Sequence, residues 1–355
     1  MRAVVVHGAG DLRVEDRPDP QVGPGEVVIA VEWGGICGSD LAYWRNGSSG
    51  TAVLRDPLVL GHEVAGRIAE IGPGVTGVEI GQPVTVHPAT LVGDGVLPER
   101  LAGRTNLYPE VRYFGSAAFH PHTDGGFVQR KAVRADQLRP LPDGVDTRSG
   151  ALAEPLAVAM HAVRRAGDIT GLDVLVNGAG PIGSLVVAAA KHAGARSVTA
   201  ADVNRAALAV AAAMGADATV DASVTGLPED IPLIFEASGS PRALGGVLHA
   251  VARGGTVVQV GNLPGAAVQA VLGDLVTREV TWIGSYRFVE EITDALAAMA
   301  AGLDVSPLMT HSFNIDEAEA ALQTAADTTS GSSKVMLRLD ATGERANRES
   351  RGGQR

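Results

Sequence analysis

Hydrophobic positions follow two different rhythms along this 355-residue chain. Up to about residue 148 they form short β-branched runs that glycine and proline interrupt, as in 2–8, 25–35, 62–72 and 83–88, a pattern typical of strands. Beyond this point apolar strands alternate with alanine-rich helical segments of about 10 to 15 residues. Such alternation predicts a parallel, doubly wound α/β sheet.

Both types of segment can be assigned from this second rhythm. The predicted helices are 153–167, 181–195, 204–216, 241–254, 290–302 and 316–327. The predicted strands are 173–177, 197–203, 231–239, 255–261, a strand within 280–286, and a closing strand at 334–339.

The change of rhythm predicts two domains. A β-rich, partly barrel-like domain is expected from residues 1–148 together with 286–340, and a nucleotide-binding domain from the inserted residues 149–285. Residues 341–355 are polar and rich in glycine and arginine, so we expect a disordered tail.

Composition narrows the function classes. The formal net charge of −11 argues against a nucleic-acid partner, which would need a basic face. A single cysteine excludes an internal disulfide. The chain shows neither a signal-peptide pattern nor an apolar run of about 18 residues, so the sequence predicts a cytoplasmic protein with no membrane association.

A glycine-rich turn opens the predicted nucleotide-binding domain. Gly178, Gly180, Pro181, Ile182 and Gly183 follow a strand and begin a helix, the context in which GxGxxG binds a pyrophosphate. A purely structural turn is the alternative. Three further residues are expected to contact the dinucleotide, namely Asp202, Arg205 and Gly261. Asp202 ends the next strand, where a carboxylate accepts from ribose hydroxyls and favours NAD over NADP, whereas Arg205 could soften that preference.

Four side chains supply ligand types of a catalytic zinc. Cys37 precedes His62 and Glu63 by about 25 residues, and Glu154 opens the first helix of the second rhythm. Taken singly, the cysteine is a small buried hydrophobe, the histidine a core residue and each carboxylate a surface or capping group. Thiolate, imidazole and carboxylate together indicate a zinc site that keeps one position open.

The motifs CGSD, GHEVAG, the Glu-Pro helix and GAGPIG resemble, in order and spacing, the zinc-dependent medium-chain dehydrogenases/reductases. The resemblance covers the chain except its tail. It implies a Rossmann domain and a GroES-like catalytic domain. Residues 112–129, and a glutamate at 154 where alcohol dehydrogenases have a metal cysteine, are similar to the polyol and sugar-acid branch. NAD-dependent oxidation of a secondary hydroxyl is implied, with L-idonate as the favoured substrate.

This resemblance also implies individual roles. Cys37 and His62 would bind zinc, Glu63 would be a direct or exchangeable ligand, and Glu154 would bind the metal or hold its water. Ser39 would pass on the substrate proton, and Asp40 would orient His62 through its second ring nitrogen. Zinc would act as a Lewis acid that lowers the pKa of the substrate hydroxyl.

The chain departs from the family pattern in two places. Ala42 stands where many relatives have a histidine of the proton relay, so water or a ribose hydroxyl could take that step. Asp94, Leu97, Arg100 and Tyr108 stand at the four positions of a structural zinc. Since leucine, arginine and tyrosine cannot build that site, we expect one catalytic zinc and no structural zinc.

Substrate contacts are expected between the domains, from Tyr43, Phe114 and Arg287, with Trp44 and His122 as further candidates. Arginine offers a bidentate fork for a carboxylate, although a structural salt bridge is the alternative for Arg287, and core packing for Tyr43 and Trp44. His120 and His122 resemble a second metal pair but favour solvent or cofactor contacts. We interpret the remaining histidines other than His62 as structural.

Several alternatives stay open at this point. A sorbitol-type, cyclitol or aminocyclitol dehydrogenase is a near alternative, a zinc-free quinone reductase a distant one, and a non-catalytic dinucleotide-binding protein belongs to another class. Relatives pair their sheets through the strand within 280–286, so a homodimer or homotetramer is expected.

Overall fold

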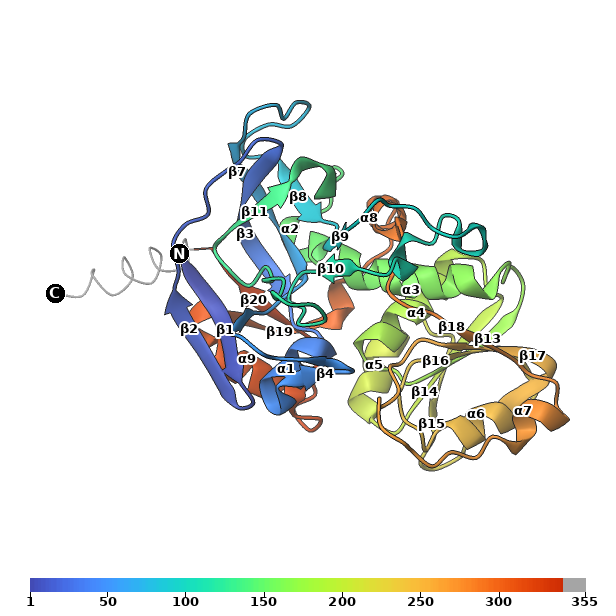
Figure 1. Ribbon diagram of the computed structural model, residues 1–355. Helices are drawn as coiled ribbons and strands as arrows, with labels where there is room; N and C mark the ends of the chain where they lie inside the picture. The colour runs from blue at the N-terminus through green and yellow to red at the C-terminus, as the bar shows by residue number, and fades with distance from the viewer. Residues whose placement is uncertain (341–355) are drawn as a thin grey trace.

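The computed structural model describes residues 1–340, and the predicted tail lies outside the described residues. Two β-sheets dominate the molecule, and Figure 1 shows them side by side with α3 (Ala153–Ala166) and α8 (Glu291–Ala300) near the boundary between them. The α/β class with one GroES-like and one Rossmann sheet is confirmed.

The first sheet is formed mainly by the amino-terminal part of the chain. Its strands lie in the order β12-β8-β7-β3-β20-β19, and β11 also pairs with β3. All neighbours are antiparallel except β19 and β20. The strands outside the parallel sheet are β1 (Arg2–Gly8), β2 (Asp11–Asp16), β3 (Glu26–Gly35), β4 (Ser48–Ser49), β5 (Ala52–Val53), β6 (Leu58–Val59), β7 (Glu63–Ile71), β8 (Pro83–Val86), β9 (Ala89–Leu91), β10 (Val111–Tyr113), β11 (Arg130–Arg134), β12 (Leu138–Pro140), β19 (Met309–Asn314) and β20 (Lys334–Arg338).

The second sheet is wholly parallel, in the order β15-β14-β13-β16-β17-β18. Its strands are β13 (Asp173–Asn177), β14 (Ser197–Asp202), β15 (Ala218–Asp221), β16 (Ile231–Glu236), β17 (Val251–Gln259) and β18 (Thr281–Gly284). The chain order reverses between β13 and β16, and ligands of such sheets bind outside the carboxyl ends of the strands at this switch point.

Helices cover the parallel sheet and join it to the rest. The α-helices other than α3 and α8 are α1 (Gly38–Asn46), α2 (Thr147–Gly150), α4 (Pro181–His192), α5 (Arg205–Ala213), α6 (Leu244–Ala250), α7 (Gly273–Thr277) and α9 (Ala318–Ala326). Short 3₁₀ turns occur at η1 (Glu99–Leu101), η2 (Thr105–Leu107), η3 (Ala135–Gln137), η4 (Ser306–Leu308) and η5 (Ile315–Glu317). None of the helices in residues 1–340 has the length and apolar character to cross a membrane.

Apolar periodicity explains why α3 packs where it does. Leu156, Ala159 and Val163 recur at helical spacing on its buried face. They belong to one core that also contains Val174 of β13 and Leu185 of α4. Burial of a leucine or valine side chain contributes about 2 kcal/mol, so the site-bearing start of α3 rests on a rigid base.

Several elements differ from the sequence prediction, which did not include β15, α7 or β19. The helix expected at 241–254 is only α6, because Val251 already pairs with Ile231 in the parallel sheet. In addition, Cys37 is the N-cap of α1, a nine-residue helix that the apolar pattern did not indicate. This helix ends at Gly47, whose φ of 65° suits a residue without Cβ.

A hydrogen bond joins the first and last of the four positions that correspond to a structural zinc. The hydroxyl of Tyr108 donates to Asp94 Oδ1 (3.1 Å) and accepts from the amide of Gly95 (3.2 Å). The amide of Val96 also donates to Asp94, and these hydrogen bonds lower the pKa of that carboxyl. Hydrogen bonds to the Asp94 carboxylate thus close the lobe between β9 and β10.

Tyr108→Phe should loosen this lobe. Removing the hydroxyl leaves Asp94 and Gly95 without their shared partner, at a cost of about 1 kcal/mol. We expect faster amide exchange or proteolysis within residues 93–104, with little change in the global unfolding midpoint. Tyr286→Phe is the matched control, and unchanged exchange in Tyr108→Phe would contradict the assignment.

Buried charges join α3 to α8. Glu291 Oε1 accepts from His161 Nδ1 (2.9 Å) and from Arg164 (3.1 Å), while its other oxygen accepts from the amides of Val289 and Glu290. Burial alone would raise the pKa of Glu291, but the hydrogen bonds from His161 and Val289 lower it to about 2. The ionised form therefore holds the two helices together.

Glu291→Gln should remove a pH-dependent part of the stability. Since the folded pKa lies below the ordinary value of 4.5, this contribution is fully present above about pH 4.5 and is lost as the pH falls towards 2. We expect wild type to exceed Glu291→Gln by up to about 3 kcal/mol at pH 7, with a gap that narrows below pH 4.5 in urea unfolding. Glu319→Gln, which affects only an exposed bond to Gln323, should show no such gap.

Candidate metal and cofactor site

Three strand ends bring the predicted zinc ligands together. Gly35, at the end of β3, pairs with Glu63 at the start of β7 and with Met336 of β20. Cys37 follows β3 by two residues, and His62 immediately precedes β7. Residues that are far apart in sequence therefore meet because β3 is flanked by β7 and β20.

Cys37, His62 and Glu63 form a compact group of possible ligands. One donor atom from each lies within 4.8 Å of the others. His62 and Glu63 are buried, and Cys37 is half-buried. Within residues 1–340 no other group of three or more histidine, cysteine or acidic side chains meets this spacing.

Glu63 is held by a buried ion pair. Lys334, the first residue of β20, donates from Nζ to Glu63 Oε1 (2.7 Å) and to the carbonyl of Ile36 (3.1 Å). Both side chains are almost inaccessible to solvent. Glu63 Oε2 is buried without a hydrogen-bond partner in the described chain, so one oxygen is fixed and the other is available to a cation.

The electrostatics of this group favour a bound cation. Burial alone would lower the pKa of His62, but the neighbouring Cys37, Glu154 and Asp40 raise it to about 10. A proton on the imidazole thus balances the surrounding anionic groups, and metal binding would release it. The orphaned Glu63 oxygen and the thiolate, imidazole and carboxylate set fit a Zn²⁺ ion.

Asp40 supports the ligands through the backbone rather than through the His62 ring. Its Oδ2 accepts from the amide of Cys37 (2.9 Å), and its Oδ1 accepts from the amide of Gly61 (3.1 Å). No hydrogen bond between Asp40 and the His62 ring is found within the described residues, although the Asp40 carboxylate acts on His62 electrostatically, so the predicted contact stays a prediction. Asp40 fixes the spacing of the segments that carry Cys37 and His62.

Glu154 lies beside the three-residue group but is not part of it. Its Oε1 accepts a hydrogen bond of 2.5 Å from the Tyr113 hydroxyl. Burial and Glu63 raise its pKa, against the opposing influence of His62. Of the two predicted roles, this placement favours holding a metal-bound water over direct ligation.

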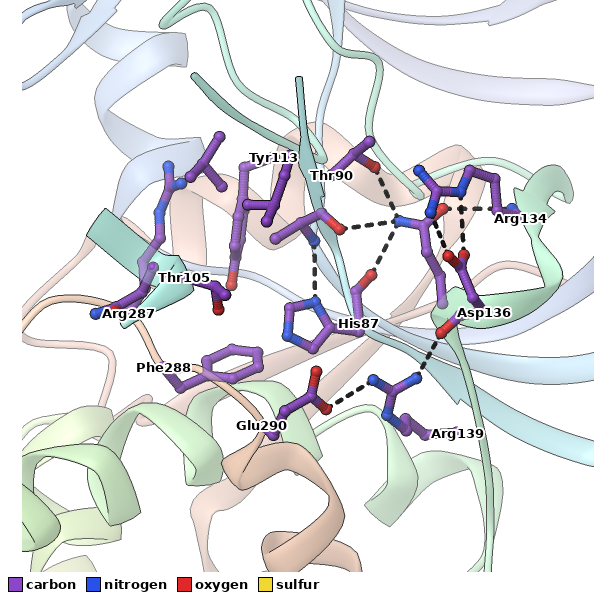
Figure 2. A pocket seen from close by; sticks show the side chains of 15 residues that line it. His87, Thr90, Thr105, Tyr113, Arg134, Asp136, Arg139, Arg287, Phe288 and Glu290 are labelled. Carbon is purple, nitrogen blue, oxygen red and sulfur yellow. Dashed lines mark hydrogen bonds and ion pairs between the residues drawn. The ribbon is translucent and has the colours of Figure 1, made fainter. Parts of the chain in front are cut away.

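Arg287 lines a cavity of about 260 Å³ that Figure 2 shows from close by. Its guanidinium carbon lies 4.0 Å from the centre of the Tyr113 ring and 5.0 Å from that of Tyr286. Arg287 forms no ion pair within residues 1–340, whereas Arg139 in the same cavity pairs with Glu290. The alternative of a structural salt bridge for Arg287 is not observed.

The other predicted substrate residues occupy different surroundings. Tyr43 and Phe114 are buried in the core of the first sheet, and Trp44 packs against the same core. The Tyr43 hydroxyl accepts from the amide of Ala117. Both Tyr43 and Phe114 are core residues of this sheet, and their contact with a substrate stays a prediction. Ser39 lies in the first turn of α1, half-buried.

His120 and His122 are committed to loop contacts. His120 Nε2 pairs with Asp56 (2.7 Å). His122 Nδ1 contacts the carbonyl of Phe119 (3.0 Å), and its Nε2 accepts from the amide of Arg55 (2.9 Å). Both ring nitrogens of His122 are therefore used, so the pair is not arranged as a second metal site.

The glycine turn leaves room for a phosphate. A Cβ on Gly183 would lie 1.7 Å from the carbonyl oxygen of Gly178, so a side chain there would collide with the turn that joins β13 to α4. A Cβ on Gly180 would meet nothing within 4 Å, and Gly180 is the N-cap of α4 with Pro181 following. Free amides at a helix start and an open approach fit a pyrophosphate. Ile182, the next residue, packs against the core.

Asp202 lies at the end of β14 beside this turn. Its Oδ2 accepts from the amide of Ala179 (2.7 Å), and its Oδ1 accepts from the amide of Asn204 (2.8 Å). Arg205 is largely exposed and pairs with Asp221. Position 261 has no room for a side chain, because a Cβ on Gly261 would lie 2.3 Å from the amide nitrogen of Gly239.

Sequence reasoning missed two residues of this site. Tyr113 lies within the stretch 112–129 that carried the resemblance, yet nothing in its own pattern marked it. Lys334 begins the predicted closing strand, and a lysine inside an apolar strand was the available signal. A lysine that is buried needs an anionic partner, which points to a buried carboxylate.

Comparisons with known proteins agree with this geometry. The alcohol dehydrogenase GroES-like domain model matches residues 23–143, and the zinc-binding dehydrogenase model matches 181–301. Sorbitol dehydrogenase of Gallus gallus is 37 % identical over 357 residues, covering 96 % of this chain and 97 % of that protein.

Two further relatives connect the chain to solved structures. L-idonate 5-dehydrogenase (NAD(P)(+)) of Escherichia coli K12 is 35 % identical, and the match covers 88 % of this chain and 91 % of that protein. The crystal structure of L-idonate 5-dehydrogenase from Escherichia coli K-12 superposes with a TM-score of 0.89 at 33 % identity. That superposition covers 95 % of this chain and 98 % of the other. A zinc-binding dehydrogenase of Sinorhizobium meliloti 1021, solved with NADP bound, has a TM-score of 0.84 at 30 % identity, covering 95 % and 98 %.

The ligand group, the glycine turn and these matches lead to one conclusion. The predicted oxidoreductase class and the cofactors zinc and NAD(P) are confirmed. The chain belongs to the zinc-dependent medium-chain dehydrogenases/reductases, in the branch that contains the sorbitol and L-idonate dehydrogenases.

Proposed function

We propose that the protein oxidises a secondary hydroxyl of a sugar acid with NAD, and that L-idonate, oxidised to 5-ketogluconate, is the favoured substrate. The observation that carries this proposal is the guanidinium of Arg287, which has no ion-pair partner within residues 1–340 and lies over the ring of Tyr113, the ring that also contacts His62 of the ligand group. Tyr113 separates the two, with its ring 5.7 Å from the His62 ring and 4.0 Å from the guanidinium carbon.

The chain's own residues would divide the work as follows. Cys37, His62 and Glu63 would hold zinc, with Lys334 and Asp40 fixing their positions. A bound zinc supplies Lewis-acid chemistry that favours loss of the substrate hydroxyl proton. Ser39 would take that proton away, and Glu154 would orient water at the open position of the site.

Arg287 would bind the acid end of the substrate. A guanidinium without an acidic partner can give its bidentate hydrogen bonds to a carboxylate. The hydroxyl-rich remainder of the chain would extend past Tyr113 towards the metal ligands. A neutral polyol would lack this contact, which is how the proposal separates a sugar acid from sorbitol or a cyclitol.

The cofactor site supports NAD as the preferred dinucleotide. Gly178, Gly180 and Gly183 would cradle the pyrophosphate, and Asp202 would accept from the ribose hydroxyls. A carboxylate at this position repels a 2′-phosphate, and Arg205 is turned towards Asp221. We further propose a cytoplasmic homodimer or homotetramer, since β18 is an edge strand of its sheet.

Zinc content separates the proposal from its rivals. Wild type should contain one zinc per chain, and Cys37→Ala should lower this at least about tenfold because one of three ligands is lost. Removal of zinc with a chelator should abolish NAD reduction without unfolding the protein. His120→Ala is the control and should keep its zinc.

Other outcomes of the zinc measurement would contradict the proposal in distinct ways. An active wild type without zinc would point to a zinc-free reductase, and zinc without any dehydrogenase activity to a non-catalytic protein. Global unfolding on chelation would mean that the metal holds the fold.

Arg287→Met should change the choice of substrate. Loss of a bidentate charged contact should raise KM for L-idonate by about 10- to 100-fold, while kcat/KM for sorbitol should change by less than about threefold. Arg139→Met, which breaks the Glu290 pair in the same cavity, is the matched control. Equal losses on both substrates would remove the argument for a sugar acid.

A further inference from the structure

Tyr113 has three functional neighbours at once. Its hydroxyl donates to Glu154 Oε1 at 2.5 Å. Its ring makes an edge contact with His62, with the two ring planes at 62° and their centres 5.7 Å apart. The guanidinium of Arg287 lies over the ring, 4.0 Å from its centre. No other aromatic side chain within residues 1–340 combines such contacts.

The position of Tyr113 is fixed by its strand. It ends β10, where it pairs with Ala89 of β9, and its side chain is 6 % exposed. In Figure 2 the ring stands between Arg287 on one side and the His87 wall of the cavity on the other. Because a phenol has an ordinary pKa of about 10, the Tyr113 hydroxyl is protonated at neutral pH and donates to Glu154.

We propose that Tyr113 is a positioning residue that aligns Glu154 with the metal group through its hydroxyl and presents Arg287 to the substrate through its ring. This inference rests on the proposed function, because it assigns one side chain to both halves of that site. It goes beyond the proposed function because it assigns one role to the Tyr113 hydroxyl and another to the Tyr113 ring, and the two roles can be tested separately.

The hydroxyl has a specific task because Glu154 has few donors. Apart from Tyr113, no hydrogen bond to Glu154 exists within the described residues, and the carboxylate is 4 % exposed. Without a hydrogen-bond donor, a buried carboxylate would rotate towards another positive charge. The charges that act on Glu154 come from Lys334 and from His62 and Glu63 of the ligand group. The phenol therefore sets which way the carboxylate faces.

The ring has a different task. Arg287 has a positive φ of 51°, an uncommon conformation for arginine, and it forms no ion pair in the part of the chain that the structure describes. Stacking on Tyr113 and Tyr286 replaces an acidic partner. The guanidinium is thus held in place while its hydrogen-bond donors stay available to a substrate carboxylate.

Two substitutions at one position separate these tasks. Tyr113→Phe removes only the hydroxyl, so kcat should fall about tenfold while KM for L-idonate and for sorbitol changes by less than about twofold. Tyr113→Leu also removes the ring face, so KM for L-idonate should rise towards that of Arg287→Met. Tyr108→Phe, whose hydroxyl lies in the lobe, should match wild type.

A double-mutant cycle tests whether the hydroxyl acts through Glu154. The loss caused by Tyr113→Phe should vanish when it is added to Glu154→Gln, because the partner is already gone. Additive losses would mean that the hydroxyl acts elsewhere, and would overturn the assignment.

A second readout does not depend on activity. With Co²⁺ in place of zinc, the visible absorption bands report the ligand environment, and Tyr113→Phe should shift them while Tyr108→Phe should not. Unfolding midpoints of all variants show whether they are folded. Unchanged bands together with unchanged kcat in folded Tyr113→Phe would overturn the proposal.

Failure of the proposed function and failure of the role assigned to Tyr113 would give different results. If the protein has no activity on either substrate, the proposed function fails, yet a shifted cobalt spectrum still supports the alignment of Glu154. If L-idonate is oxidised but Tyr113→Leu keeps its KM for L-idonate, the proposed function stands and the role of the ring is wrong.

Discussion

The buried ion pair between Lys334 and Glu63 is the interaction on which the rest of the site depends. Several acidic groups and a thiol are enclosed near the end of β3, and burying such charges is costly unless they are paired. Lys334 neutralises part of this charge and ties β20 to the first residue of β7. The remaining negative charge raises the pKa of His62, and a divalent cation held by the proposed ligands would relieve it.

Much of the fold could be predicted from the sequence because it rests on local pattern. The alternation after residue 150 indicated the parallel sheet, and Gly178 to Gly183 indicated where its switch point lies. The 241–254 helix was too long because pairing of Val251 with β16 is a tertiary contact that no local window contains. Helix α1 was missed for the related reason that it lacks an apolar stripe.

The candidate site was predictable in its ligand types and less so in its contacts. Cys37, His62 and Glu63 were marked by motif and are brought together by strand pairing. The partners of Asp40 and Glu154 were assigned differently, since the amide of Gly61 and the hydroxyl of Tyr113 approach only in three dimensions. The lobe between β9 and β10 gives a similar example. The sequence indicated only that its residues cannot build a structural zinc site, whereas the structure shows a hydrogen bond between Tyr108 and Asp94.

Cys37 is also the only thiol in the chain. A thiolate that binds a metal is withdrawn from alkylating and oxidising reagents, and one that has lost its metal is exposed to them. If Cys37 is a metal ligand as proposed, no other sulfhydryl would compete for a thiol reagent, and each equivalent consumed would correspond to one metal-free molecule. The reactivity of this one thiol would then report metal occupancy, and metal loss and oxidation would act on the same sulfur atom.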